Sequence, residues 1–322
     1  MSNLGILYRR EAKYQKAEEM YLKVLDIKRR VQGEDHPDTL TTMNSLGVVY
    51  IYEGRLPQAE AILIKTLAAR QRILGPDHPG TLLTMSNLGL VYSDEGKYAE
   101  AESILRQTLA ARQRVSGPEH ADTLLAAVNL ADVLDNERKD REAEELVSHS
   151  LEIAQRVYGK EHSQTTQLTI MLARLRERAG KSSDAEALFK AALEARTRAL
   201  GPDHDVTLMT ALDLGQFRMN QHQYGPAEAL FRPALASYEK NRPQTWQRYL
   251  GSSLLGQALQ GQKKYGEAEP LLIAGYEGLL ARKDSIAVYS RHFIDDTRQA
   301  LVKLYQDWGK PEKAAEWKAK HE

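Results

Sequence analysis

The amino-acid sequence predicts an all-α solenoid of about eight antiparallel helix pairs. Three observations support this fold class. One pattern of residues returns every 42 positions, which is typical of repeat proteins built from stacked supersecondary units. Within each unit, apolar residues follow the three- and four-residue spacing of amphipathic helices. Small residues return where two helix backbones must approach each other closely. Length alone does not set the number of domains, because such arrays grow in one direction.

The repeat period is visible in several registers that stay in phase. Glycine recurs at Gly33, Gly75, Gly117, Gly159 and Gly201. Histidine follows three residues later at His36, His78, His120, His162 and His204. Threonine, arginine and an Ala-Glu pair keep the same step. Registers that coincide over five units indicate one structural unit repeated along the chain.

Each unit is predicted to contain two helices. In one unit the first helix carries Leu46 and Tyr50 and ends near Gly54, since glycine is favoured just past a helix end. The second helix begins around the Ala-Glu pair at Ala59 and continues through Leu63. The segment Asp35-His36-Pro37 suits the start of a first helix, because it offers a polar capping side chain followed by a proline.

The small residue after the key leucine of the first helix predicts a close helix–helix contact. In the second unit this residue is Gly47, and we expect the alanine of the Ala-Glu pair, Ala59, to face it from the partner helix. A bulky side chain at either position would separate the two helices. Since neither helix can bury its apolar stripe alone, stacking of the pairs should produce one continuous core.

These motifs resemble those of the tetratricopeptide repeat family. Leu46-Gly47-x-x-Tyr50, followed by Gly54, Ala59 and Leu63, is similar to the signature of that family. The 42-residue unit with its linker Leu74-Gly75-Pro76-Asp77-His78-Pro79 resembles the kinesin light chain type of repeat. The resemblance covers residues 1 to about 240 and implies a right-handed superhelix.

The repeat pattern changes after residue 240. The alanine register moves by 41 residues and then by 46, to Ala268 and Ala314. We therefore predict regular repeats over 1–240, the first one truncated, and two degenerate repeats with a terminal cap over 241–322 in the same solenoid. The end of the chain, Leu301 to Pro311, also resembles tetratricopeptide regions attached to bacterial serine/threonine protein kinases. Because Met1 enters the repeat in mid-helix, we expect a fragment of a longer protein or a frayed first helix.

The amino-acid composition excludes several classes of function. Lysine plus arginine and aspartate plus glutamate each number 44, so no global field favours nucleic acid or an anionic membrane. The chain has no cysteine, which removes thiol nucleophiles and cysteine-ligated metals. No apolar run has the roughly 18 residues of a membrane helix. The expected compartment is the cytoplasm.

No group of residues predicts catalysis. The five periodic histidines lie about one repeat apart, on the order of 10 Å, whereas one metal ion holds its nitrogen ligands at about 2 Å; we interpret them as linker and capping residues. Gly180-Lys181-Ser182 lacks the strand and the earlier glycine of a phosphate-binding loop, which indicates a turn. We therefore expect no enzyme activity, no metal and no cofactor.

The family resemblance implies where a ligand would bind. In this family the first helix of each pair lines the concave groove, and the leucine register carries that face onto this chain. Along the sequence, the groove positions of the second and third pairs are mostly apolar or uncharged, those of the fourth pair are acidic, and those of the fifth pair are basic. The candidate groove residues are Asn44, Val48, Ile51, Tyr52, Asn87, Leu90, Asn129, Asp132, Asp135, Arg174 and Arg178.

Two functional hypotheses follow. The first is a non-catalytic scaffold that binds a peptide segment of a protein partner in its groove, as the recruiting or regulatory region of a larger signalling protein. The second is self-association through an uncapped amino-terminal face, because an open solenoid end exposes apolar surface. Neither hypothesis involves a nucleic acid or a membrane.

Overall fold

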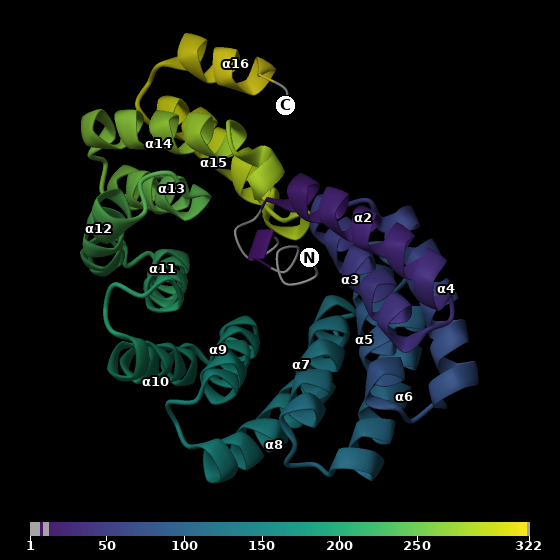
Figure 1. Ribbon diagram of the computed structural model, residues 1–322. Helices are drawn as coiled ribbons and strands as arrows, with labels where there is room; N and C mark the ends of the chain where they lie inside the picture. The colour runs from purple at the N-terminus through teal and green to yellow at the C-terminus, as the bar shows by residue number, and fades with distance from the viewer. Residues whose placement is uncertain (1–6, 9–12, 321–322) are drawn as a thin grey trace. The chain divides into compact units, whose positions relative to one another are not determined.

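The computed structural model describes residues 7–8 and 13–320 and contains helices and turns over that part of the chain (Figure 1). The prediction of an all-α fold of antiparallel helix pairs is confirmed. The helices are α2 (Tyr14–Gln32), α3 (Pro37–Glu53), α4 (Leu56–Leu74), α5 (Pro79–Asp94), α6 (Tyr98–Ser116), α7 (Ala121–Asn136), α8 (Asp140–Tyr158), α9 (Ser163–Arg178), α10 (Ser182–Leu200), α11 (Asp205–Asn220), α12 (Tyr224–Asn241), α13 (Trp246–Gly261), α14 (Tyr265–Leu280), α15 (His292–Asp307) and α16 (Pro311–Ala319), with the 3₁₀ turns η1 (Lys283–Ser285) and η2 (Val288–Ser290).

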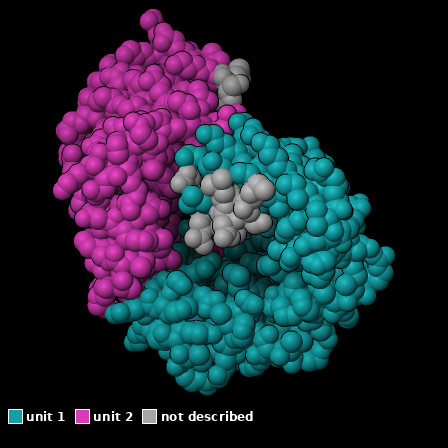
Figure 2. All heavy atoms as spheres, viewed as in Figure 1, with its two compact units in different colours: residues 1–175, 287–289 teal, residues 176–286, 290–322 magenta. Residues whose placement is uncertain are grey.

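The chain divides into two compact units (Figure 2). Unit 1 comprises Met1–Leu175 and Ala287–Tyr289, and unit 2 comprises Arg176–Ile286 and Ser290–Glu322. The division falls near the end of α9. The predicted change at residue 240 concerns the regularity of the repeats, which is a different property, and it stays a prediction.

Within each unit, consecutive helices pack against each other and alternate helices lie side by side. In unit 1, α3 contacts α4 and also α5, and α5 contacts α7. In unit 2, α11 contacts α13, and α13 contacts α15. The odd-numbered helices of a unit therefore share one face, and the even-numbered helices cover the other side of the pair. We call the surface that α3, α5 and α7 form in unit 1 the α3–α5–α7 face.

The linker histidines cap the helices that follow them, as the sequence predicts. In each linker the imidazole Nδ1 accepts a hydrogen bond from the backbone N–H two residues later, at 3.0–3.3 Å. This bond satisfies one of the N–H groups that a helix start leaves without an intrahelical partner. The five capping residues are His36, His78, His120, His162 and His204.

Threonine and arginine repeat with the histidines because they close the same linkers. Thr81 Oγ1 donates to the carbonyl oxygen of Gly75 at 2.8 Å, across the linker turn. Arg156 forms an ion pair with Glu119 of the preceding linker, at 2.6 Å. Asp35 and Asp77 make the equivalent ion pairs with arginines 37 residues later, Arg72 and Arg114. The period thus reflects contacts between successive repeats.

The small residue of the first helix lies against the large residue of its partner helix. A Cβ on Gly47 would lie 2.8 Å from Leu63, and one on Gly215 would lie 2.2 Å from Phe231. The atoms nearest to Gly47 belong to Leu63 and Ile62, and the predicted contact of Ala59 with Gly47 stays a prediction. Glycine is required since the side chain of the partner helix fills the space above it.

The turn inside each pair adopts a left-handed conformation at one residue. Gly54, Gly96 and Gly180 have φ of 72–77° there, which places Gly180-Lys181-Ser182 in a turn between α9 and α10, as predicted. Elsewhere the same turn carries a side chain: Arg138 has φ 62°. Non-glycine residues adopt this conformation at a cost of about 1 kcal/mol or more. The turn geometry persists where its glycine is lost.

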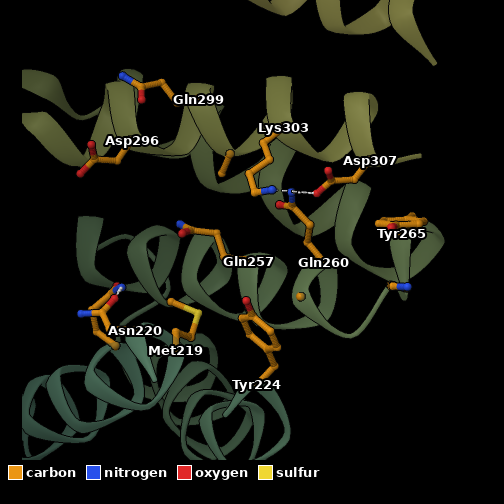
Figure 3. Close-up of a pocket in the computed structure, with 14 residues that line it drawn as sticks. Met219, Asn220, Tyr224, Gln257, Gln260, Tyr265, Asp296, Gln299, Lys303 and Asp307 are labelled. Carbon is orange, nitrogen blue, oxygen red and sulfur yellow. Dashed lines mark hydrogen bonds and ion pairs between the residues drawn. The ribbon is translucent and has the colours of Figure 1, made fainter. Parts of the chain in front are cut away.

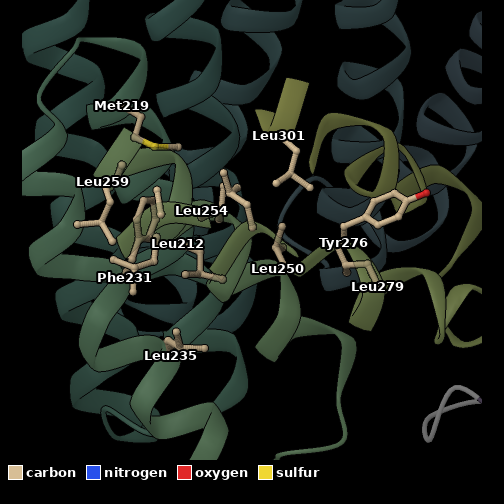
Figure 4. Packing of buried hydrophobic residues seen from close by; sticks show 14 of the residues in the cluster. Leu212, Met219, Phe231, Leu235, Leu250, Leu254, Leu259, Tyr276, Leu279 and Leu301 are labelled. Atoms are coloured by element: carbon tan, nitrogen blue, oxygen red, sulfur yellow. The ribbon is translucent and has the colours of Figure 1, made fainter. Parts of the chain in front are cut away.

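The core of unit 2 is one continuous apolar cluster (Figure 4). Leu212, Phe231 and Leu259 meet at its centre, and each is at most 2% exposed. At its far end Trp317 lies edge-on to Tyr276, with ring centroids 5.2 Å apart. The last helix pair therefore stays packed on α14 even though its sequence departs from the repeat.

Candidate functional site

The α3–α5–α7 face of unit 1 carries a cavity of about 580 Å³. Helix α3 and helix α5 supply most of its walls, and α7 supplies one acidic side chain. Most of the lining side chains are apolar or uncharged, and none is basic. The cavity is lined by Tyr21, Asn44, Ser45, Val48, Ile51, Tyr52, Leu83, Asn87, Leu90, Asp94, Asp132 and Tyr289.

The cavity brings together part of the predicted groove. The candidates that line it are Asn44, Val48, Ile51, Tyr52, Asn87, Leu90 and Asp132. Four candidates do not line it: Asn129 and Asp135 are half-buried elsewhere on α7, Arg174 is an exposed residue of α9, and Arg178 belongs to unit 2. The predicted change from acidic to basic residues along one groove therefore does not extend into this cavity.

A pair of amide side chains lies at the centre of the cavity wall. Asn87 Nδ2 donates to Asn44 Oδ1 at 3.1 Å, although the two residues come from successive repeats. Asn44 is 6% exposed. Each amide has a donor and an acceptor end, so the pair leaves one donor end and one acceptor end without a bond to the described residues. That remainder is the same if both amides are flipped.

Asp94 and Asp132 are the charged residues among those that line the cavity. Both residues are exposed, yet the protein atoms around their carboxyl groups displace much of the surrounding water. This desolvation raises the pKa of each to about 6, and for Asp132 the positive charge of Arg174 opposes part of the rise. Neither carboxylate forms an ion pair with a described residue. A cation bound beside them would lower both pKa values.

Five lining residues are not among the candidate groove residues: Tyr21, Ser45, Leu83, Asp94 and Tyr289. Tyr21 lies on α2, a second helix of its pair, and Ser45 follows Asn44 on α3. Tyr289 lies in η2, and its ring centroid is 6.4 Å from that of Tyr52. Tyr52 in turn stacks on Tyr14 at 5.3 Å. The repeat period gives no signal for Tyr289, because η2 has no counterpart in the regular units.

Unit 2 has a cavity of its own, of about 690 Å³ (Figure 3). Its charged groups have both signs, with Lys263 and Lys303 against Asp296 and Asp307. Several of its polar groups bond to one another: Lys303 Nζ and Gln260 Nε2 donate to Asp307 Oδ2 at 3.1 and 3.2 Å. The formal charges of the unit 2 cavity cancel, whereas those of the unit 1 cavity are all negative. The unit 1 cavity therefore discriminates more strongly between ligands of different charge.

Metal centres and membrane spans are not found in the part of the chain that the structure describes. Residues 7–8 and 13–320 contain no group of three or more histidine, aspartate or glutamate side chains placed to hold a metal ion. No helix within them has the length and apolar composition needed to cross a bilayer. The predicted self-association face lies at the amino end, where residues 1–6 and 9–12 fall outside the described residues.

Solved structures share this fold. The quorum sensor NprR from B. thuringiensis aligns with a TM-score of 0.67 and 14% identity, over 98% of this chain and 85% of that one. A Rap protein complexed with competence and sporulation factor aligns with a TM-score of 0.61 and 14% identity, over 98% and 94%. A putative kinesin light chain with TPR-like repeats from Podospora anserina aligns with a TM-score of 0.54 and 23% identity, over 61% and 93%. At these identities the likeness concerns the fold alone.

Sequence comparison gives a short match and a long one. A nucleotide-binding leucine-rich repeat-like protein from Hyaloscypha variabilis is 46% identical over 44 residues, which is 14% of this chain and 4% of that protein. The family model described as tetratricopeptide repeat matches residues 1–63, 44–114, 84–147 and 122–198. These segments together cover more than half of the chain. The chain belongs to the tetratricopeptide repeat family.

Proposed function

We propose that the α3–α5–α7 face of unit 1 binds an extended peptide segment of a partner protein without catalysing a reaction. Tetratricopeptide repeats generally bind proteins, and the finer assignment rests on one observation. The amide pair of Asn44 and Asn87 offers one donor end and one acceptor end inside a cavity lined mainly by uncharged side chains.

An extended peptide suits this cavity for two physical reasons. Its backbone carries one N–H and one C=O per residue, and burying either without a partner costs about 1–3 kcal/mol. The amide pair supplies partners for one of each. Side chains of the peptide would then bury apolar surface against Val48, Leu83 and Leu90, at about 25 cal/mol per Å² of apolar area removed from water.

Two structural neighbours support a regulatory context for such binding. The Rap protein was solved in complex with competence and sporulation factor. A Signal Transduction ATPase with Numerous Domains from Pyrococcus horikoshii has a tetratricopeptide repeat sensor, and this chain covers 99% of its own length and 47% of that protein. By analogy with them, the chain acts as the recruiting or regulatory region of a larger signalling protein.

The experiment uses two exposed apolar residues that differ in position. Leu83 lines the cavity on α5, whereas Ile64 lies on α4 outside it, and each is 45% exposed. Peptides are first selected from a random twelve-residue display library against the whole chain. Their affinity is then measured by fluorescence anisotropy for the parent chain, Leu83→Gln and Ile64→Gln.

We expect Leu83→Gln to weaken binding at least tenfold, which corresponds to about 1.4 kcal/mol, because it removes apolar contact without adding charge, and Ile64→Gln to leave it within about twofold. Since both side chains are exposed, both variants should keep the parent's circular dichroism spectrum and melting temperature. Equal effects of the two substitutions, or a library that yields no binding peptide, would reject the proposed function.

A further inference from the structure

The unit 1 cavity is acidic. Twelve residues line it, two of them are aspartates, and none is lysine, arginine or histidine. Asp94 comes from the end of α5 and Asp132 from the middle of α7. The two carboxylates therefore reach one cavity from neighbouring repeats.

Asp94 and Asp132 differ from acidic side chains elsewhere in unit 1 that form ion pairs. On the even-numbered helices, for example, Glu102 pairs with Arg106 at 2.7 Å and with Lys139 at 2.7 Å. By contrast, no ion pair within 4.0 Å or hydrogen bond joins Asp94 or Asp132 to a described residue. Arg174 acts on Asp132 through space but does not line the cavity.

A second, independent observation supports a binding site in this cavity. Asn44 is more than nine-tenths buried and lines the cavity, and one end of its amide has no hydrogen-bond partner among the described residues. That amide end is open to the cavity and not sealed inside the protein, so a ligand in the cavity can bond to it. The amide pair and the carboxylates therefore face the same space from α3, α5 and α7.

We propose that the unit 1 cavity selects a peptide that carries a lysine or arginine between apolar residues, with Asp94 and Asp132 holding the cationic group. This inference rests on the proposed function, since it names the class of peptide that the same site accepts. Charge-assisted hydrogen bonds from an ammonium or guanidinium group to carboxylates are shorter and stronger than neutral ones. Ile51, Leu83 and Leu90 supply apolar contacts for the flanking residues.

The cavity also disfavours negatively charged peptides. An acidic peptide would bring a carboxylate next to two others with no basic side chain in the lining to compensate. Like charges in a partly desolvated site repel more strongly than they do in water. Discrimination thus comes from attraction to one class of peptide and from repulsion of the other.

The first part of the test is the composition of peptides selected on the whole chain. Lysine and arginine should be enriched and aspartate and glutamate depleted relative to the library. Each selected peptide is then compared with a copy in which citrulline, a neutral analogue of similar shape, replaces arginine, or norleucine replaces lysine. We expect the neutral copy to bind about tenfold more weakly.

The second part compares two double variants that change the formal charge equally. Asp94→Asn/Asp132→Asn removes both carboxylates from the cavity, while Glu19→Gln/Glu152→Gln removes two exposed carboxylates from α2 and α8. The first variant should lose about tenfold in affinity for the basic peptide and lose its preference over the neutral copy. The second should bind like the parent.

The outcomes separate the two proposals. Peptides that are sensitive to Leu83→Gln but bind equally well in their basic and neutral forms would overturn the charge assignment and leave peptide binding intact. Equal affinities of the two double variants for the basic peptide would also overturn the charge assignment alone. A library that yields no peptide sensitive to Leu83→Gln rejects the proposed function, and the charge assignment with it.

Discussion

At the scale of single residues, Asn44 shows what the sequence can and cannot predict. Its place beside the key leucine puts it on the groove face by resemblance to the family. The burial of Asn44 is not predictable from the sequence. Its hydrogen-bond partner Asn87 is 43 residues away, so the two residues do not occupy equivalent positions of the 42-residue repeat. Only the packing of α3 against α5 brings the two amides together. Both residues are therefore groove candidates on sequence grounds, while their contact is a property of the fold.

The two cavity aspartates are unequally predictable for a similar reason. Asp132 is a groove candidate by its register, and Asp94 follows the same helix register, but neither position indicates a lack of partners. The lack of an ion-pair partner depends on the fold, which surrounds the carboxylates with uncharged side chains and keeps Arg174 outside the cavity. A pKa raised to about 6 is a consequence of the folded surroundings.

These raised pKa values predict how stability changes with pH. A carboxyl group whose pKa is about 6 when folded and 3.8 when unfolded binds more protons in the folded state between those values. Stability contributed by the group therefore decreases as the pH rises from about 4 to about 6. Arg174 acts on Asp132, and Tyr289 interacts electrostatically with Asp94.

Asp94→Asn/Asp132→Asn should therefore make the chain more stable than the parent at pH 7.5 and nearly equal to it at pH 4. Solvent screening of these exposed carboxylates reduces the size of the effect but not its sign. Urea unfolding at the two pH values measures it. A variant that is less stable than the parent at pH 7.5 would contradict the assigned desolvation.

At the scale of helices and turns, most of the structure is predictable from the sequence. Helix starts follow the histidine caps, and the linkers follow the glycine and threonine registers, because each is a local hydrogen-bond pattern. The partner of Gly47 is not predictable in this way, since spacing gives the face of a helix but not which of several side chains reaches across. The left-handed turn at Arg138 carries no glycine and so gives no sequence signal.

The turn between α7 and α8 provides a stability test. Arg138 has φ 62°, and its side chain makes no hydrogen bond or ion pair with the described residues. Arg138→Gly should stabilise unit 1 by about 0.5–1 kcal/mol, because glycine adopts this conformation without the steric cost of a Cβ. The free energy of unfolding in urea measures the change.

The matched control for this turn is Gly96→Ala, at the equivalent position with φ 76° and nothing within 4 Å of an added Cβ. It should destabilise the chain by about 1 kcal/mol, since the space is open but the backbone conformation is unfavourable for alanine. Shifts of stability in the same direction for both substitutions would show that backbone conformation does not control the stability of this turn.

At the scale of the whole molecule, the period predicts an array but not its division. The boundary between the compact units falls at Leu175, inside a helix whose repeat pattern is intact. Ala287–Tyr289 belongs with residues 1–175, although more than 100 residues separate them in sequence. Contacts of this kind depend on tertiary packing, which a pattern of nearest-neighbour repeats does not encode.

The central claim is that the α3–α5–α7 face binds a peptide, and hydrogen exchange of the whole chain with a selected peptide tests it most directly. Mass spectrometry of exchanged fragments should show slower exchange, on binding, in α3, α5 and α7 around the cavity. Protection restricted to the even-numbered helices α4, α6 and α8, with the peptide bound, would contradict the claim.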